Sequence, residues 1–330
     1  MRLAHLHLAG ITHYTHASHL QEALIQRHFR YKDSLKIVHS TTTTTTTTTP
    51  PPTTVSVTSP PDPVVLTFTC HPTYTVGRRY LSSSSPTPSS SSSSSSPPPP
   101  SGHNPKPTYH ISATQQSFLR GSPLNLAAFH STPRGGDLTF HGPGQLTAYP
   151  ILDLRRHHIT PRAYISLLET AVQRTCSRLS VPNTMTTSNP GVWMSGGQRK
   201  ICAVGVQVRR GITGHGIALN VRDDEVRPGS GYETGKSKDG KAGGILSWGF
   251  NRIVACGLEG KSVTWLTREG AQQDLQVANV AGLFVVEFAK ELAAIDEIYN
   301  LTEEDVAAAH LQKKTHSTVD MRAVEECFTS

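Results

Sequence analysis

The chain carries one lysine and two cysteines in settings that favour nucleophilic chemistry. Lys200 opens the apolar stretch KICAVGVQV, where it either points outward from an edge strand or is partly buried; burial would lower its pKa. On a strand, Cys202 would share a face with Lys200, which makes it a candidate nucleophile. Cys256 precedes Gly257, and backbone N–H groups beside a glycine can stabilise a thiolate or an oxyanion. For either cysteine, an inert buried thiol is the commoner alternative.

The stretch RGGDLTFHGPGQ (134–145) combines two glycine-rich turns with one histidine. Residues without a Cβ let the main chain approach a ligand closely, although two tight β-turns without a ligand explain the pattern equally well. The stretch lacks the GxxxxGKS and GxGxxG patterns, so it does not indicate a phosphate cradle. His141 is a candidate ligand donor, a base or a satisfied core histidine. Arg134 would bind a carboxylate or cap a carbonyl.

Composition excludes several classes of protein. The formal net charge of the 330 residues is +7, but Lys and Arg are scattered, which favours an acidic partner protein over nucleic acid. The five cysteines form no CxxC pair, so we expect reduced thiols and neither a zinc site nor a disulfide framework. No apolar run approaches the roughly 18 residues of a membrane span. Residues 2–9 read as a strand, which would leave little room for a removable leader.

Hydrophobic periodicity predicts the elements that must position these residues. Helices are expected over residues 14–31, from Thr160 and Pro161 to Leu179, and over 277–295. Residues 71–80 are expected to form a loop. Strands are expected over residues 2–9, 64–70, 124–130, 137–141, 145–152, 191–194, 199–209 and 213–221. Runs of strands broken by three main helices indicate an α+β fold.

Low-complexity tracts divide the chain. The Thr/Pro tract within residues 40–62 and the Ser/Pro tract within 81–107 lack the apolar surface needed to order them, so both are expected to be disordered insertions. Residues 222–247 are predicted to be an exposed polar loop. We therefore expect one catalytic domain over residues 1–300, interrupted by these segments, and a polar tail over 301–330.

Taken together, these motifs resemble the LipB-type lipoyl (octanoyl) transferases of the mitochondrial, eukaryotic type. The resemblance rests on HPTYTVGR (71–78), RGGDLTFHGPGQLTAYPILDL (134–154), RKICAVGVQVRRGITGHGIALNV (199–221) and IVACGL (253–258). It implies a single α+β domain of the biotin/lipoate protein ligase–transferase superfamily, with mixed sheets and flanking helices. It assigns the acyl tunnel to Arg134, Gly135, Gly136, Asp137, Leu138, Thr139, Phe140, His141, Ala203, Val204, Gly205, Gly216, Ile217 and Ala218.

The same resemblance implies a reaction. An octanoyl or lipoyl group moves from acyl carrier protein to a lysine of a lipoyl domain, with Cys256 as the thioester-forming nucleophile and Lys200 as its activator. His141 would shape or polarise the site without acting as the base. Neither ATP, a metal nor another cofactor is implied. The implied acceptors are the lipoyl domains of 2-oxoacid dehydrogenase complexes and the glycine cleavage H protein, and the implied state is a mitochondrial monomer.

Three departures from the family pattern bear on this hypothesis. Ala255 replaces the usual proline before the catalytic cysteine, Trp265 replaces a serine, and Asp137 stands where the family favours an amide or a base. Two other hypotheses remain open: an ATP-dependent lipoate–protein ligase of the same superfamily, and a non-catalytic lipoyl- or acyl-binding regulator. The ligase would need an acyl-adenylate site and no essential cysteine.

Overall fold

The computed structural model describes part of the chain in detail. The described residues are 1–42, 59–78, 111–224, 226, 229–232, 243–253, 260–292, 295–308 and 318–319. The predicted disordered tracts (40–62 and 81–107) lie mostly outside these residues, as does about half of the predicted polar loop (222–247).

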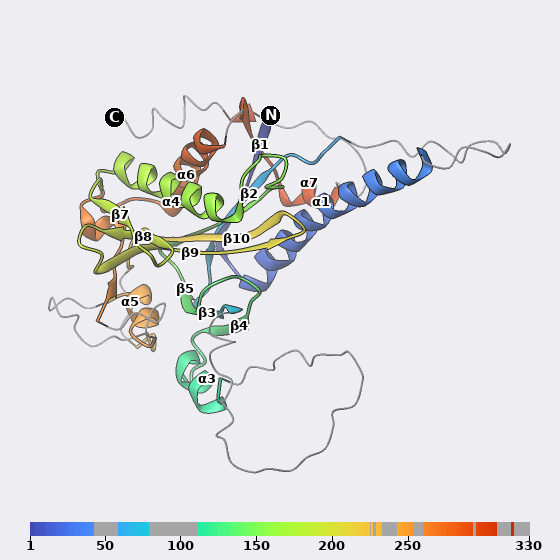
Figure 1. The fold of residues 1–330 in the computed structure, drawn as a ribbon. Helices are drawn as coiled ribbons and strands as arrows, with labels where there is room; N and C mark the ends of the chain where they lie inside the picture. Colours follow the sequence, from blue (N-terminus) through green and yellow to red (C-terminus); the bar gives the residue numbers. More distant parts are fainter. Residues whose placement is uncertain are drawn as a thin grey trace, which may run out of the picture.

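A large mixed sheet forms the centre of the molecule (Figure 1). Its 10 strands run in the order β13-β12-β1-β2-β6-β10-β9-β8-β7, and β11 pairs with β9. The strands are β1 (Arg2–Thr12), β2 (Val64–Cys70), β6 (Gln145–Ile151), β7 (Thr184–Thr186), β8 (Gly191–Met194), β9 (Arg199–Arg209), β10 (Ile212–Asn220), β11 (Ser262–Val263), β12 (Glu297–Asn300) and β13 (Thr318–Val319). β1 pairs in parallel with β2 and β12, whereas the path from β2 through β6, β10, β9 and β8 to β7 is antiparallel. This mixture confirms the α+β prediction.

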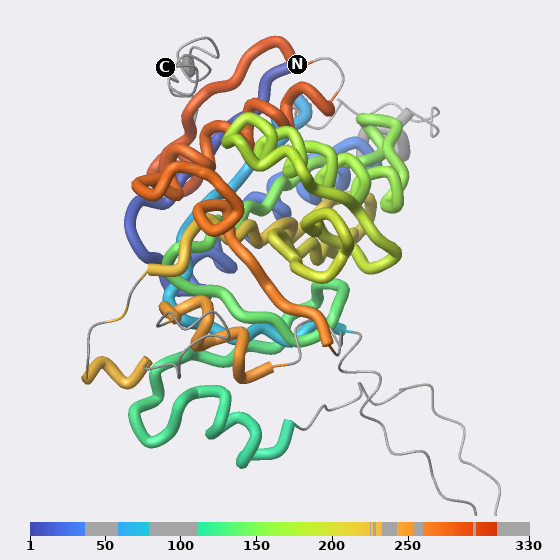
Figure 2. Tube along the Cα trace, turned by 90° about the vertical axis from the view of Figure 1, so that its left-hand side faces the viewer, coloured from blue at the N-terminus to red at the C-terminus, as the bar shows by residue number. Residues whose placement is uncertain are grey.

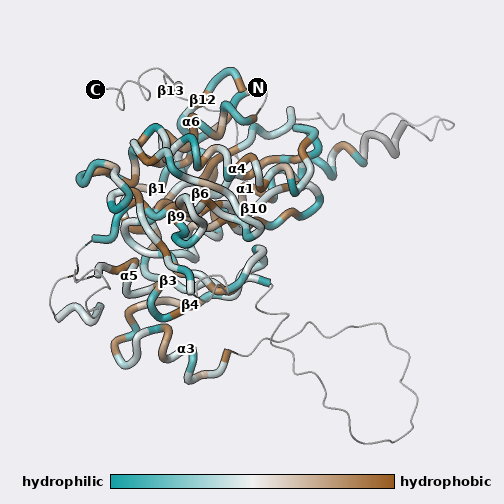
Figure 3. Tube along the Cα trace, turned by 60° about the vertical axis from the view of Figure 1, so that its left-hand side comes forward, coloured by the Kyte–Doolittle hydropathy of each residue, from teal (hydrophilic) through white to brown (hydrophobic). Residues whose placement is uncertain are grey.

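A second sheet of three strands, in the order β4-β3-β5, lies below the main sheet in Figures 1 and 2. Its strands are β3 (Thr73–Val76), β4 (Ala128–Ser131) and β5 (Leu138–His141). The short helices α3 (Ala113–Arg120) and α5 (Ile245–Phe250) cover it. Part of α5 is brown, and therefore hydrophobic, in Figure 3, and its Leu246 and Trp248 are buried against the small sheet.

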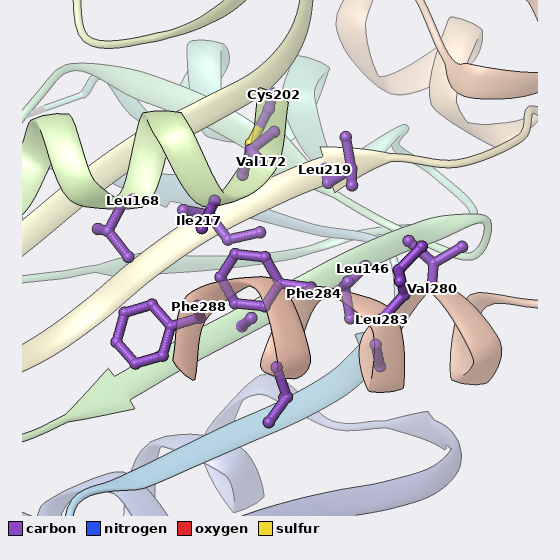
Figure 4. Close-up of a cluster of buried hydrophobic side chains, with 14 of the residues drawn as sticks. Leu146, Leu168, Val172, Cys202, Ile217, Leu219, Val280, Leu283, Phe284 and Phe288 are labelled. Carbon is purple, nitrogen blue, oxygen red and sulfur yellow. The ribbon is translucent and has the colours of Figure 1, made fainter. Parts of the chain in front are cut away.

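Helices cover both faces of the main sheet. On one face lie α4 (Pro161–Arg178) and α6 (Val277–Glu291), whose apolar side chains build the largest core with β6, β9 and β10 (Figure 4). On the other lie α1 (Tyr14–Thr42) and α7 (Glu303–Ala308). The 3-10 helix η2 (Leu266–Glu269) follows β11.

Local chemistry fixes the helix that borders the site. Thr160 Oγ1 accepts a hydrogen bond from the Ala163 backbone N–H at 3.2 Å, and Pro161 occupies the first turn of α4. Both features satisfy or avoid an otherwise unpaired N–H group. The predicted start of α4 is therefore confirmed.

Two sequence predictions are wrong. The segment 71–80, expected to be a loop, contains β3, because its alternating Thr, Tyr and Val side chains are all buried between β4 and β5. The strand expected over 124–130 begins only at Ala128, in β4, because residues 121–124 form a turn and Asn125 has a φ of +50°. The helix α3, which the periodicity did not reveal, begins with a capping box between Ser112 and Gln115.

The C-terminal segment is more structured than expected. Residues 301–330 were predicted to be a polar tail, yet α7 buries Val306 against α1 and β13 pairs with β12 at the edge of the main sheet. No helix within the described part of the chain is long and apolar enough to cross a membrane.

Candidate active site

A cavity of about 170 Å³ lies against β9 and β10, under the segment 134–141. An apolar cavity of roughly 150 Å³ accepts a molecule as large as benzene, so this cavity has room for a small aliphatic group. Of the described residues that the resemblance assigns to the site, every one except Phe140 lines it. Six further residues complete the wall: Tyr149, Ile165, Asn189, Pro190, Val206 and His215.

Lys200 is buried at the start of β9, with 5% of its surface exposed, and it lines the cavity. Its Nζ donates a hydrogen bond to the Pro190 carbonyl oxygen at 3.2 Å and lies 4.5 Å from the centre of the Trp193 ring. The carbonyl oxygen and the aromatic face hold Nζ at the wall of the cavity. The outward-pointing alternative for Lys200 is therefore wrong.

The buried carboxylate of Glu169 is linked to Lys200 through Gly191. Glu169 on α4 accepts a hydrogen bond from the Gly191 N–H at 2.8 Å, and Gly191 packs directly against Lys200. A Cβ at position 191 would lie 3.2 Å from Lys200 Cε and 2.5 Å from the Cys202 carbonyl oxygen. Burial raises the pKa of Glu169, whereas the Gly191 N–H and the charge of Lys200 lower it. Glu169 and Gly191 thus shape the position that the lysine occupies.

The RGG segment packs against β9, and glycines in β9 and β10 allow close backbone packing. The Gly135 N–H donates to the Val206 carbonyl oxygen at 2.9 Å, so the segment docks along β9 beyond the point where β8 ends. A Cβ at Gly205 would lie 3.1 Å from the Gly135 carbonyl oxygen, and one at Gly216 would collide with the Ala148 carbonyl oxygen. For Gly205 and Gly216, the expectation that glycine makes room for a ligand is refined, because the atoms closest to an added Cβ are protein backbone.

Arg134 caps carbonyl groups. Its guanidinium donates to the Thr75 carbonyl oxygen at 2.6 Å, to the Asp137 carbonyl oxygen at 2.9 Å and to the Gly135 carbonyl oxygen at 2.9 Å. Of the two roles open from the sequence, carbonyl capping is the one these contacts provide. Arg134 therefore ties the 134–137 segment to β3.

A series of buried hydrogen bonds connects Thr75 on β3 with Thr264, which follows β11. The Thr75 hydroxyl lies 3.2 Å from His141 Nε2, and His141 Nδ1 lies 2.8 Å from Gln145 Oε1. Because an amide oxygen only accepts, Nδ1 carries the proton and Nε2 accepts from Thr75. Gln145 then donates to Asn220 Oδ1 at 2.9 Å, and Asn220 donates to the Thr264 carbonyl oxygen at 2.9 Å.

This chain of bonds ends beside the lysine, since the Thr264 N–H donates to the Lys200 carbonyl oxygen at 2.9 Å. Burial, and to a lesser extent the Arg134 charge, lower the pKa of His141 to about 4. Both ring nitrogens of His141 have partners, so the satisfied core histidine best describes it. Its ring fixes the geometry of the cavity wall as a neutral group.

The two cysteines differ sharply. Cys202 is fully buried in the main core beside Val172, as Figure 4 shows, and it does not line the cavity. Burial raises the pKa of its thiol well above the usual range, which disfavours the thiolate. Cys202 is therefore poorly suited to act as the nucleophile, because its thiol is buried away from the cavity and is held protonated. Cys256 lies outside the described residues.

Both flanks of the segment that carries Cys256 are described. Ile253 packs on the small-sheet core. On the other side, Lys261 Nζ lies 4.8 Å from the centre of the Trp193 ring, and Val263 pairs with Lys200. The chain therefore returns to the lysine seven residues after Cys256.

Phe140 does not line the cavity. Its ring is completely buried in the small-sheet core, 5.0 Å from the ring of Tyr74 and 6.0 Å from that of Trp248. Because successive strand residues point to opposite faces, its neighbours Thr139 and His141 face the cavity instead. Among the described residues, no cluster of three or more His, Cys, Asp or Glu side chains is arranged to hold a metal ion.

Comparison with known proteins identifies the family. Residues 123–289, about half of the chain, match the model of the lipoyl protein ligase A/B catalytic domain. The chain belongs to this family. The matched range contains the segment 134–141, Lys200 and Cys256.

Individual relatives within the family are octanoyltransferases. The chain is 34% identical to a "Probable octanoyltransferase" of Schizosaccharomyces pombe, over 67% of this chain and 74% of that protein. It is 30% identical to the mitochondrial octanoyltransferase of Saccharomyces cerevisiae, over 74% of this chain and 65% of that protein. It is 38% identical to the mitochondrial octanoyl-acyl-carrier-protein:protein N-octanoyltransferase of Homo sapiens, over 52% of this chain and 61% of that protein. The chain therefore spans less than two thirds of the last two relatives.

A solved structure shares the fold. Lipoate-protein ligase A bound with ATP aligns over 94% of this chain and 93% of its own, with a TM-score of 0.50 and 12% identity. These findings confirm the predicted fold, the resemblance to the octanoyltransferases and the assignment to the acyltransferases.

Proposed function

We propose that the chain transfers an octanoyl group from acyl carrier protein to a lysine of a lipoyl domain, through a thioester on Cys256. One observation carries this proposal: the buried side chain of Lys200 lines a cavity bordered by residues 134–139, β9 and β10. An acyl chain has no polar groups beyond its carbonyl, so a mostly apolar cavity with a lysine side chain in its wall suits it.

The first step forms the acyl-enzyme. A free thiol with a pKa near ~8.5 is only a few per cent thiolate at neutral pH, so Cys256 needs a nearby cation or base. Lys200 supplies it, and the pairing of Val263 with Lys200 supports their proximity. The thiolate attacks the octanoyl carbonyl, a new carbon–sulfur bond forms, and the bond to the carrier's sulfur breaks. Lys200 takes the proton that the Cys256 thiol loses and passes it to the carrier's sulfur, so the carrier leaves as a thiol and the Lys200 amine is neutral again.

The second step releases the product. The amine of the acceptor lysine attacks the Cys256 thioester, the carbon–sulfur bond breaks and an amide bond forms. Lys200 takes the proton that the amine loses and returns it to the Cys256 sulfur. The exchange of thioesters is nearly balanced in energy and amide formation is downhill, so the sequence of steps needs neither ATP nor a metal.

The partners follow from this chemistry. We propose octanoyl-acyl carrier protein as donor, and the lipoyl domains of 2-oxoacid dehydrogenase complexes and the glycine cleavage H protein as acceptors. The net charge of +7 would steer acidic carriers toward the enzyme. Because the yeast and human relatives are mitochondrial by name, we also propose a mitochondrial location, and a monomer as the working state.

One experiment separates this proposal from an ATP-dependent ligase. The protein is incubated with a lipoyl domain and either octanoyl-acyl carrier protein alone or free octanoate with ATP. We expect the lipoyl domain to gain one octanoyl mass only from the carrier protein, and Cys256→Ala to abolish the gain. Transfer from octanoate and ATP alone would overturn the proposal in favour of the ligase.

A further inference from the structure

His215 separates the acyl cavity from a second cavity. His215 lines both cavities, and only 2% of its surface is exposed. It lies on β10 opposite Val206, six residues along β9 from Lys200. Strands rise by about 3.3 Å per residue, so His215 is roughly 20 Å from the lysine along the sheet. The lysine and the histidine therefore line well-separated parts of the acyl cavity.

The backbone of His215 is held in an unusual conformation. Its φ is +56°, in the left-handed region that non-glycine residues seldom adopt. Its N–H donates to Gln21 Oε1 of α1 at 2.6 Å, which anchors this part of β10 to the helix. The ring of Tyr149 packs edge-on against the imidazole at 5.3 Å. The fold therefore fixes the imidazole firmly in place.

The imidazole has no polar role in the rest of the fold. Neither of its ring nitrogens has a hydrogen-bond partner among the described residues. An unpaired buried polar ring costs stability, so its retention calls for another explanation. Burial, Arg134 and His141 lower its pKa to about 3, so the ring stays neutral at physiological pH.

The second cavity differs chemically from the first. It has a volume of about 330 Å³ and lies between α1, β9 and the end of β4. Apart from Pro133, its lining side chains carry polar or charged groups, including an ion pair of 2.7 Å between Arg209 and Glu22. Methylene groups gain little from entering a polar space, so this cavity would suit an acyl chain poorly.

We propose that His215 is the end wall of the acyl cavity and limits the length of the acyl chain that the enzyme accepts. An extended chain of carbon–carbon bonds near 1.5 Å, with angles near 111°, advances by about 1.25 Å per carbon. An octanoyl chain is therefore about 9 Å long and ends before His215. A dodecanoyl chain, about 14 Å long, would approach the wall once the reach of the lysine and cysteine side chains is included.

This inference rests on the proposed function, but binding can test it separately. The probes are free octanoate and dodecanoate, with affinities measured by calorimetry on the full chain. His215→Gly removes the wall and suits the positive φ, and His215→Asn keeps a smaller polar group that also tolerates this φ. His130→Ala is the matched control, because His130 lines the second cavity only.

Each additional buried methylene is worth about a fourfold gain in affinity, so four methylenes set an upper limit of roughly 200-fold. The polar second cavity keeps the gain below this limit, because methylene groups benefit less from entering it. We therefore expect His215→Gly to raise the dodecanoate-to-octanoate affinity ratio by at least tenfold. We expect His215→Asn to raise it less and His130→Ala to leave it unchanged. The same order should appear in transfer from dodecanoyl- and octanoyl-acyl carrier protein.

Three results would overturn the inference: a wild-type protein that binds neither acid, an unchanged ratio in His215→Gly, or an equal change in His130→Ala. Failure of the proposed function is a distinct result. In that case the wild type would bind octanoate without transferring any octanoyl group from the carrier.

Discussion

Removal of the Glu169 carboxylate should slow acyl transfer by disturbing the position of Lys200. In Glu169→Ala the Gly191 N–H loses its acceptor at 2.8 Å, while Glu169→Gln retains an oxygen in that place. The neighbouring Pro190 carbonyl oxygen, which holds Lys200 Nζ at 3.2 Å, belongs to the same segment. Loss of the carboxylate therefore disturbs Gly191 and the adjacent Pro190, which both contact Lys200.

The size of the effect follows from these contacts. A buried N–H without a partner costs about 1–3 kcal/mol, so Glu169→Ala should lose about that much unfolding free energy. A displacement of about 1 Å at a catalytic group can cost about 100-fold in rate. We expect a fall of about 10–100-fold in the rate of acyl-enzyme formation for Glu169→Ala, and less than about threefold for Glu169→Gln.

The assay is the time course of octanoyl addition, followed by intact-protein mass spectrometry with octanoyl-acyl carrier protein in excess. Urea unfolding at the same temperature shows that each variant remains folded. A folded Glu169→Ala protein with the wild-type rate would refute the positioning role. An equal loss in Glu169→Gln would refute the hydrogen bond as its cause and point to the charge instead.

Three further predictions follow from the same geometry. Lys200→Met should slow acylation by at least about 100-fold in the mass assay while the urea midpoint changes little; a wild-type rate would remove Lys200 from the mechanism. Phe140→Ala should cost about 3–5 kcal/mol of unfolding free energy without changing the acyl-length preference, and a changed preference would return Phe140 to the cavity. Stability should fall as the pH drops from 7.5 to 5.5. Burial lowers the pKa of His28 and His141 to about 4, and that of His5 and His215 to about 3, so the unfolded chain binds protons that the folded chain excludes. Each of these four histidines should lower the free energy of unfolding, measured in urea, by roughly 1 kcal/mol between pH 7.5 and pH 5.5. An unchanged or higher stability at pH 5.5 would contradict the assignment of neutral buried rings.

The elements with strong local signals were predictable from the sequence. α4 has its N-cap at Thr160 and a buried stripe at helical spacing, and both features act within a few residues of the chain. By contrast, the turn-forming residues around β3 hid a strand of four residues whose burial depends on β4 and β5. Such burial is a tertiary effect, which local patterns do not record.

The site was predictable in part. The resemblance assigned the segments that line the cavity, but not Glu169 or His215, because their roles depend on contacts between distant parts of the chain. Phe140 was assigned to the tunnel with its neighbours, although the alternation of β5 turns it into the small-sheet core. That alternation was the signal available in the sequence.

The central claim is that Cys256 carries the acyl group while Lys200 activates it. Its most direct test is intact-protein mass spectrometry after treatment with octanoyl-acyl carrier protein, followed by peptide mapping of the adduct. We predict a single added octanoyl group on Cys256, and none in Cys256→Ala. An adduct on Cys202, or transfer to a lipoyl domain by Cys256→Ala, would contradict the account.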